Sequence, residues 1–70
     1  MEIRQVLAAN MKRLRRSAGL SQEELAHRAG LDRTYISALE RCQYAASVDV
    51  LAKLALELGV SAAELLELRQ

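Results

Sequence analysis

Residues 21–41 read SQEELAHRAGLDRTYISALER, and this stretch contains the start and the end of one short helix and the start of another. Ser21 and Glu24 have the spacing of a capping box, in which each side chain accepts a hydrogen bond from the other residue's backbone N–H. Gly30 supplies the positive φ that a tight turn between helices requires. Asp32 then suits the N-cap of the next helix. The stretch therefore predicts two helices separated by a turn at Gly30.

Small and apolar residues predict that these two helices cross closely. Ala26 is small enough for the two backbones to approach each other, and Ile36, ten residues later, would pin the second helix against the first. Together with Gly30 they predict a helix-turn-helix, in which the second helix presents its outer face to a partner. Four further residues complete the apolar set: Leu25, Ala29, Leu31 and Leu39.

The same signals predict one helix before this pair and two after it. Apolar residues recur every three or four positions from Ile3 to Ala18 and stop at Gly19, which is typical of an amphipathic helix. Ser47 is the expected N-cap of a fourth helix that closes at Gly59. Its expected inward residues are Val48, Leu51, Leu54, Ala55 and Leu58.

A second capping box, SAAE at residues 61–64, predicts a fifth helix that carries Leu65, Leu66 and Leu68. Residues 1–70 are therefore predicted to form one all-α domain. Its expected architecture is a compact five-helix bundle in which the second and third helices make the helix-turn-helix.

Composition narrows the class of protein. The formal net charge is +1 and the pI about 7.9, below the value of about 9 that marks a strongly basic domain. Charge is unevenly distributed: residues 1–41 carry eight Lys/Arg against five Asp/Glu (+3), and residues 42–70 carry two against four (−2). This asymmetry fits either a nucleic-acid-binding half or a chance arrangement of solvated side chains. With a single Cys and no long apolar run, we expect a cytoplasmic, nucleoid-associated protein without a membrane segment.

The helix-turn-helix and its flanks resemble the lambda-repressor-like, Cro-type family, also called the xenobiotic-response-element family of bacterial and phage regulators. The resemblance runs from about Leu7 to Leu66. It rests on LRRSAGLSQEELAHRAGLDRTYISALER (14–41) and, less specifically, on LAKLALELGVSAAELL (51–66). It implies a DNA-binding domain, usually a homodimer, whose third helix enters the major groove of double-stranded DNA.

The resemblance also implies roles for individual residues. Positions that face base edges are occupied by Arg33, Thr34, Ser37 and Ala38, and positions that contact phosphate by Gln22, Arg41, Gln43 and Tyr44. The chemistry agrees, because the planar fork of Arg33 suits guanine O6 and N7, whereas Ala38 offers only a methyl group for a thymine methyl. Arg15 and Glu40 match a family pair that bridges the first helix to the end of the third; otherwise they are two unrelated surface charges.

The chain departs from the family after the third helix. Cys42 stands where the family has a glycine in the left-handed conformation, so either Cys42 is mildly strained or the helix runs further. Ala45 and Ala46 stand where the family tends to have an asparagine and a proline, so the loop that carries Gln43 and Tyr44 lacks the family's usual rigid turn. Cys42 is either a small filler or, less expectedly, a redox-sensitive thiol.

These observations favour a sequence-specific transcriptional regulator, a repressor in the first instance, that reads a palindromic operator as a homodimer. The dimer interface is predicted on the fifth helix and the turn before it: Val60, Ala62, Leu66 and Leu68. The alternative is a protein-interaction module built on the same bundle. No enzyme is expected, since one His, one Cys and no clustered carboxylates provide no catalytic set. No cofactor, metal or small-molecule ligand is expected either.

Overall fold

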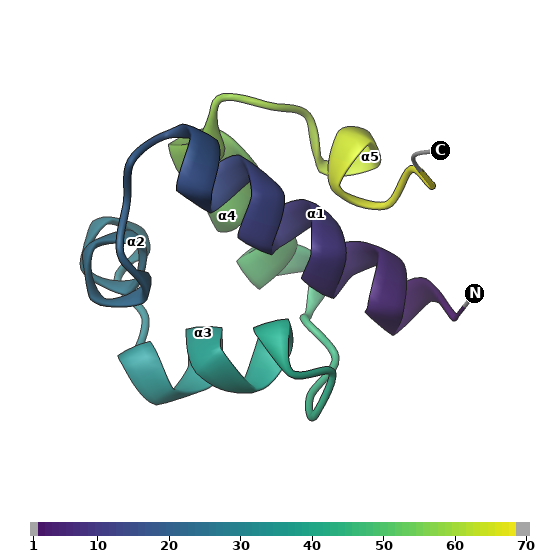
Figure 1. The fold of residues 1–70 in the computed structure, drawn as a ribbon, viewed down its shortest axis with the longest axis horizontal. Helices are drawn as coiled ribbons and strands as arrows, with labels where there is room; N and C mark the ends of the chain where they lie inside the picture. The colour runs from purple at the N-terminus through teal and green to yellow at the C-terminus, as the bar shows by residue number, and fades with distance from the viewer. Residues whose placement is uncertain (1, 69–70) are drawn as a thin grey trace.

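The computed structural model describes residues 2–68, and these form five α-helices without a β-strand (Figure 1). The helices are α1 (Ile3–Ser17), α2 (Gln22–Ala29), α3 (Arg33–Glu40), α4 (Val48–Leu58) and α5 (Ala62–Leu65). Helix α1 crosses the middle of the view, α4 lies behind it and α3 runs below it. The predicted all-α class and five-helix arrangement are confirmed.

The ends of α2 are held by short-range hydrogen bonds. The Ser21 hydroxyl accepts from the Glu24 backbone N–H at 3.0 Å, and the Glu24 carboxylate accepts from the Ser21 N–H at 3.2 Å. Gly30 ends the helix with a φ of 69°, and the N–H of Leu31 donates to the carbonyl of Ala26 at 2.8 Å. These bonds satisfy backbone groups that a helix end otherwise leaves without partners.

The core draws at least one fully buried side chain from every helix. Burying a side chain of this size stabilises the fold by about 1.5–3 kcal/mol, so every helix contributes to one shared core. Ala26 and Ile36, the predicted crossing residues of α2 and α3, are 2% and 0% exposed. The largest of the fully buried side chains are Met11, Leu25, Ile36, Leu39, Leu54 and Leu65.

Two sequence predictions about the fold are wrong. Val48 was expected to face the core, but its side chain is 82% exposed. It is the first residue of α4, at the end of the bundle, where no other helix covers the apolar stripe. The fifth helix is also shorter than predicted: it ends at Leu65, Leu66 is its C-cap, and Leu68 lies beyond it. A single turn contributes little helix stability of its own, because nucleation is unfavourable.

Asn10 holds this short α5 to α1, a role that sequence reasoning missed. Its side chain is 3% exposed, and its Nδ2 donates to the carbonyl of Leu65 at 2.9 Å and to that of Glu67 at 2.8 Å. A longer contact of 3.4 Å reaches the carbonyl of Glu64. One buried amide thus supplies donors to backbone carbonyls at the end of α5. A lone Asn inside an apolar stripe was the available signal.

Candidate nucleic-acid interface

The outer face of α3 carries three of the four predicted base-contacting residues. Ser37 lies four residues after Arg33 and three after Thr34, so the three side chains form one patch on the helix. Arg33 and Thr34 are exposed and Ser37 is half-buried. Within residues 2–68, no carboxylate lies within 4.0 Å of the Arg33 guanidinium. Its planar donors are therefore open to an external acceptor.

Unlike the guanidinium of Arg33, the hydroxyl of Thr34 already donates a hydrogen bond within the chain. This hydroxyl donates to the Asp32 carboxylate at 2.9 Å, and the Thr34 backbone N–H donates to the same oxygen at 3.1 Å. The backbone hydrogen bond and then the hydroxyl lower the pKa of Asp32, which keeps the N-cap ionised. The Thr34 hydroxyl can still accept a hydrogen bond, and its methyl group remains available for apolar contact.

Ala38 does not lie on this patch. Its side chain is only 4% exposed, so the prediction that it occupies the open face is wrong. The reason is the path of the chain after α3, which turns back along the helix. The N–H of Gln43 donates to the Ala38 carbonyl at 2.9 Å, and the Tyr44 ring lies 6.1 Å from the ring of Tyr35.

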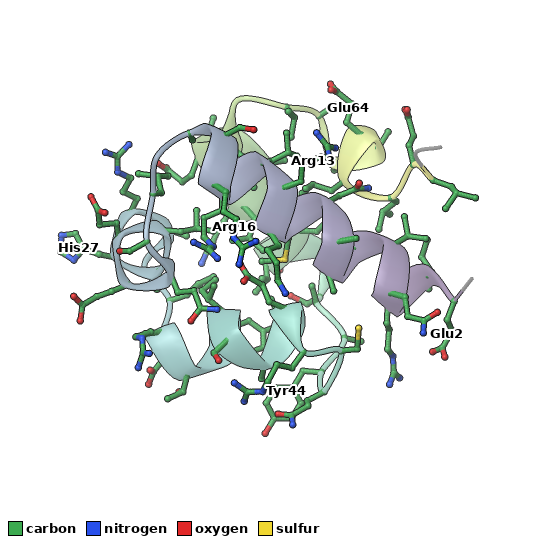
Figure 2. The ribbon with its side chains drawn as sticks, viewed as in Figure 1. Glu2, Arg13, Arg16, His27, Tyr44 and Glu64 are labelled. Carbon is green, nitrogen blue, oxygen red and sulfur yellow. The ribbon has the colours of Figure 1, made fainter. Side chains whose placement is uncertain are left out.

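Beside the patch, hydrogen bonds connect Arg41 to two other residues that were predicted to contact DNA. One Arg41 guanidinium nitrogen donates to the Ser37 hydroxyl, and the other donates to the Gln43 side-chain carbonyl at 3.0 Å. Arg41 and Gln43 are exposed, as is Tyr44 at 58%; Tyr44 lies below the end of α3 in Figure 2. A guanidinium has five N–H donors, so Arg41 keeps donors free for an anion.

The edge of α3 that runs from Arg33 to Glu40 is tied to α1 and α2 by a buried charged network at its Glu40 end. The Arg15 guanidinium makes two bonds to the Glu40 carboxylate, at 2.7 and 3.1 Å, and donates to the Leu20 carbonyl at 2.9 Å. Gln22 adds a third donor to Glu40 at 3.0 Å. The structure therefore brings Arg15 and Glu40 together. It also shows that Gln22, for which the sequence predicted only a phosphate partner, is hydrogen-bonded to Glu40.

The electrostatics of Glu40 follow from these contacts. Burial, the largest influence, raises the pKa of the Glu40 carboxyl. The hydrogen bonds from Arg15 and Gln22, together with the charges of Arg15 and Lys12, lower it, and the pKa ends below its ordinary value. Glu40 is therefore ionised and holds both side chains in place. Since one N–H of the Gln22 amide bonds to Glu40, the other remains free for the predicted phosphate.

The structure decides between a strained Cys42 and a longer third helix. The helix ends at Glu40, and Cys42 has a φ of 61°, the only positive φ outside glycine in the described part of the chain. Cys42 therefore adopts the left-handed conformation despite its Cβ, at a cost of about 1–2 kcal/mol. Its thiol lies 3.8 Å from the carbonyl of Arg4, and the side chain is half-buried.

His27 is exposed and lies on the outer side of α2 (Figure 2). Among residues 2–68, no three His, Cys, Asp or Glu side chains are grouped as metal ligands. None of the helices in this range has the length and apolar character needed to cross a membrane.

Comparison with known proteins identifies the family. The helix-turn-helix family model HTH_3 matches residues 11–65. A hypothetical transcription factor from Neisseria meningitidis serogroup B is 49% identical over 65 residues, which cover 93% of this chain and 61% of the relative. This chain thus spans less than two thirds of that relative. The control protein C.SmaI from Serratia marcescens is 41% identical over 66 residues, covering 94% of this chain and 79% of the relative.

A solved structure agrees with these sequence matches. The restriction-modification controller protein C.AhdI from Aeromonas hydrophila superposes with a TM-score of 0.85 and 39% identity. The match covers 89% of this chain and 94% of that protein. The resemblance to lambda-repressor-like regulators is confirmed.

Proposed function

This chain belongs to the helix-turn-helix family, and we propose that it is a DNA-binding transcriptional regulator that inserts α3 into the major groove. The observation that carries the proposal is the patch on α3, where Arg33 presents an unpaired guanidinium beside two hydroxyl side chains. Groups of this kind read base edges in the major groove. The likeness to a transcription factor and to control proteins supports the same function.

Residues around the patch are the proposed phosphate contacts. Gln22 is the first residue of α2, where free backbone N–H groups and the helix dipole favour an anion. Arg41 retains unused donors on the other side of the patch, next to Gln43 and Tyr44. Such contacts position the protein on the duplex, while Arg33 supplies sequence preference.

Arg33→Ala tests the assignment. We expect the variant to lose about 1–3 kcal/mol on the preferred site and to relax the preference at one base pair, because a bidentate guanine contact is lost. Selection of duplexes from a random pool gives the site, and titration on the preferred and unrelated duplexes gives the loss. Arg28→Ala removes the same charge from the exposed face of α2 and serves as the control.

Two results would count against this proposal. An equal loss for Arg33→Ala on every sequence would make Arg33 a phosphate contact. Absence of salt-sensitive duplex binding by the unmodified chain would remove DNA as the partner and favour a protein-interaction module.

The structure also bears on the proposed homodimer. Val60 and Ala62, two of the four predicted interface residues, are half-buried and pack against the core. Leu66 and Leu68 remain 37% and 59% exposed. Val60 and Ala62 do not line the groove that we propose below as the interface, so this interface excludes them.

A groove at one end of the molecule is the better candidate. Ile3 and Val48, 56% and 82% exposed, line this groove of about 240 Å³ together with Leu66. The start of α1 and helix α5 lie at the same end of the molecule (Figure 1). We propose that a second copy covers this apolar end groove, whose lining is completed by Arg4, Leu7, Ala45, Ala46 and Leu51.

A palindromic operator sets the spacing that such a dimer must meet. The molecule is 28 Å long between Cα atoms, along the horizontal axis of Figure 1. In the proposed dimer the two α3 helices must lie about 34 Å apart, one turn of DNA, to reach two half-sites.

Val48→Glu tests the dimer with little effect on folding, because Val48 is exposed. We expect a monomer in sedimentation and weaker binding to a palindrome, with half-site binding unchanged. Leu56→Glu is the matched control, since Leu56 is on the same helix and 77% exposed but does not line the groove. Equal behaviour of the two variants would refute this interface.

A further inference from the structure

A basic groove on α1 has no role in the contacts described so far. It is an open groove of about 410 Å³, lined by Ala8, Ala9, Lys12, Arg13, Arg16 and Glu40. Lys12 follows Ala8 by four residues and Arg16 follows Lys12 by four, so the three share one stripe of the helix. The two alanines have short side chains, which leave the space beside the cations open. In the view of Figure 2, Arg16 is labelled between α1 and α3.

The groove carries three cations and one carboxylate, that of Glu40. Within residues 2–68, Arg15–Glu40 is the only pairing of a Lys or Arg with a carboxylate within 4.0 Å. Glu40 is bonded to Arg15, and although the charge of Lys12 helps to lower the Glu40 pKa, neither Lys12 nor Arg16 has a carboxylate within 4.0 Å in this part of the chain. Arg13 differs, because it donates to the Asn10 side chain at 3.3 Å. The groove thus carries two cations whose donors are free for an external anion.

The position of Glu40 on α3 places this groove relative to the base-reading patch. Glu40 lies seven residues after Arg33, two helical turns, so both lie along one edge of α3. Arg41 lies seven residues after Thr34 and marks the other edge. On the Arg33 edge, Glu40 accepts a hydrogen bond from Gln22. Glu40 also lines the α1 groove, so this groove adjoins the Arg33 edge.

A helix in the major groove has a sugar–phosphate backbone on either side, because the groove is only about 12 Å wide. One strand would pass the Thr34 edge, where Arg41, Gln43 and Tyr44 are the proposed contacts. The other would pass the Arg33 edge, where Gln22 supplies an amide and no charge. The α1 groove adds two positive charges on that edge.

We propose that Lys12 and Arg16 bind a backbone phosphate of the operator, adjacent to the phosphate contacted by Gln22. This inference rests on the proposed function and extends the interface from the helix-turn-helix onto α1. The contact is independent of sequence, because phosphates carry no base information. It also concentrates positive charge at the interface of a chain whose net charge is only +1.

The test is the salt dependence of binding by Lys12→Gln, Arg16→Gln and the double variant. Each phosphate contact contributes about −0.9 to the slope of log affinity against log salt concentration. We expect each single variant to bind every duplex more weakly and to reduce the slope by up to about 0.9, with the site preference unchanged. Arg28→Gln is the control: it removes the same charge from the exposed face of α2, where Arg28 lines an open hollow together with Glu23, Glu24 and His27.

The possible outcomes separate this inference from the function on which it rests. If the unmodified chain binds duplex DNA with a steep salt dependence and the double variant retains the slope of Arg28→Gln, the groove is not a phosphate site. A changed site preference at unchanged slope would likewise overturn the proposal. If the unmodified chain binds no duplex, the proposed function itself falls and this inference with it. Matching urea midpoints for all four variants and the unmodified chain exclude misfolding as the cause of any loss.

Discussion

Replacing Asn10 by alanine removes the side chain that holds the last helical turn to α1. The two short bonds from its Nδ2, of 2.9 and 2.8 Å to the carbonyls of Leu65 and Glu67, are lost. Each such bond contributes about 1 kcal/mol net, and a buried carbonyl left without a donor costs about 1–3 kcal/mol. We therefore expect Asn10→Ala to lower the free energy of unfolding by about 2–4 kcal/mol.

Asn10→Asp separates hydrogen bonding from packing. The two side chains have nearly the same shape. Arg13, which donates to the Asn10 side-chain oxygen at 3.3 Å, can also donate to an aspartate, but the second oxygen of an ionised carboxylate only accepts hydrogen bonds and would face carbonyl oxygens. We expect Asn10→Asp to be less stable than Asn10→Ala at neutral pH. Burial raises the pKa of such a carboxyl in the folded state, so its stability should increase as the pH falls and the carboxyl regains a donor.

Urea unfolding followed by circular dichroism measures both variants. A lower midpoint at an unchanged slope means lost stability without a change in the surface exposed on unfolding. Ser17→Ala is the control, because Ser17 is an exposed polar residue on the same helix and should change stability by less than about 0.5 kcal/mol. If the Asn10→Asp variant were as stable as the unmodified chain at neutral pH, the reasoning would be refuted.

Three further predictions concern the buried network and the turn after α3. A double-mutant cycle with Arg15→Met and Glu40→Gln should give a coupling energy of about 0.5–3 kcal/mol, since the residues are in contact; additive losses would contradict the pairing. Because the folded-state pKa of Glu40 lies below its ordinary value, its stabilisation is present above the unfolded-state pKa. It should be lost as the pH falls through the folded-state pKa, and acid titration of Glu40→Gln should show a flatter decline. Cys42→Gly should raise the free energy of unfolding by up to about 1 kcal/mol over Cys42→Ser, because glycine adopts a φ of 61° without strain; a serine variant at least as stable would argue against strain at this position.

The helix ends were predictable because the interactions that form them are short-range. The capping box of Ser21 and Glu24 and the left-handed Gly30 act within three or four residues of chain. Helix α2 ends just before Gly30 and α3 begins just after Asp32, as the sequence predicted. The resemblance to a known family added the assignment of Arg15 and Glu40 as partners, which lie 25 residues apart.

Burial of individual side chains was predicted less well, because it depends on what covers a helix. Val48 and Ala38 illustrate opposite errors. Val48 continues an apolar stripe past the end of the bundle and is exposed, whereas Ala38 is buried where the chain after α3 turns back. Neither covering element can be located from the periodicity of the helix itself.

The sequence by itself determined five helices, their order, the turn at Gly30 and the open face of α3 around Arg33, since helix periodicity and capping are local. Only the tertiary structure decided which surfaces adjoin that face. It placed the α1 groove beside Glu40, bonded Gln22 to Glu40, and set Asn10 against carbonyls 54 to 57 residues away. These juxtapositions depend on how helices pack, and packing brings together residues that no local pattern connects.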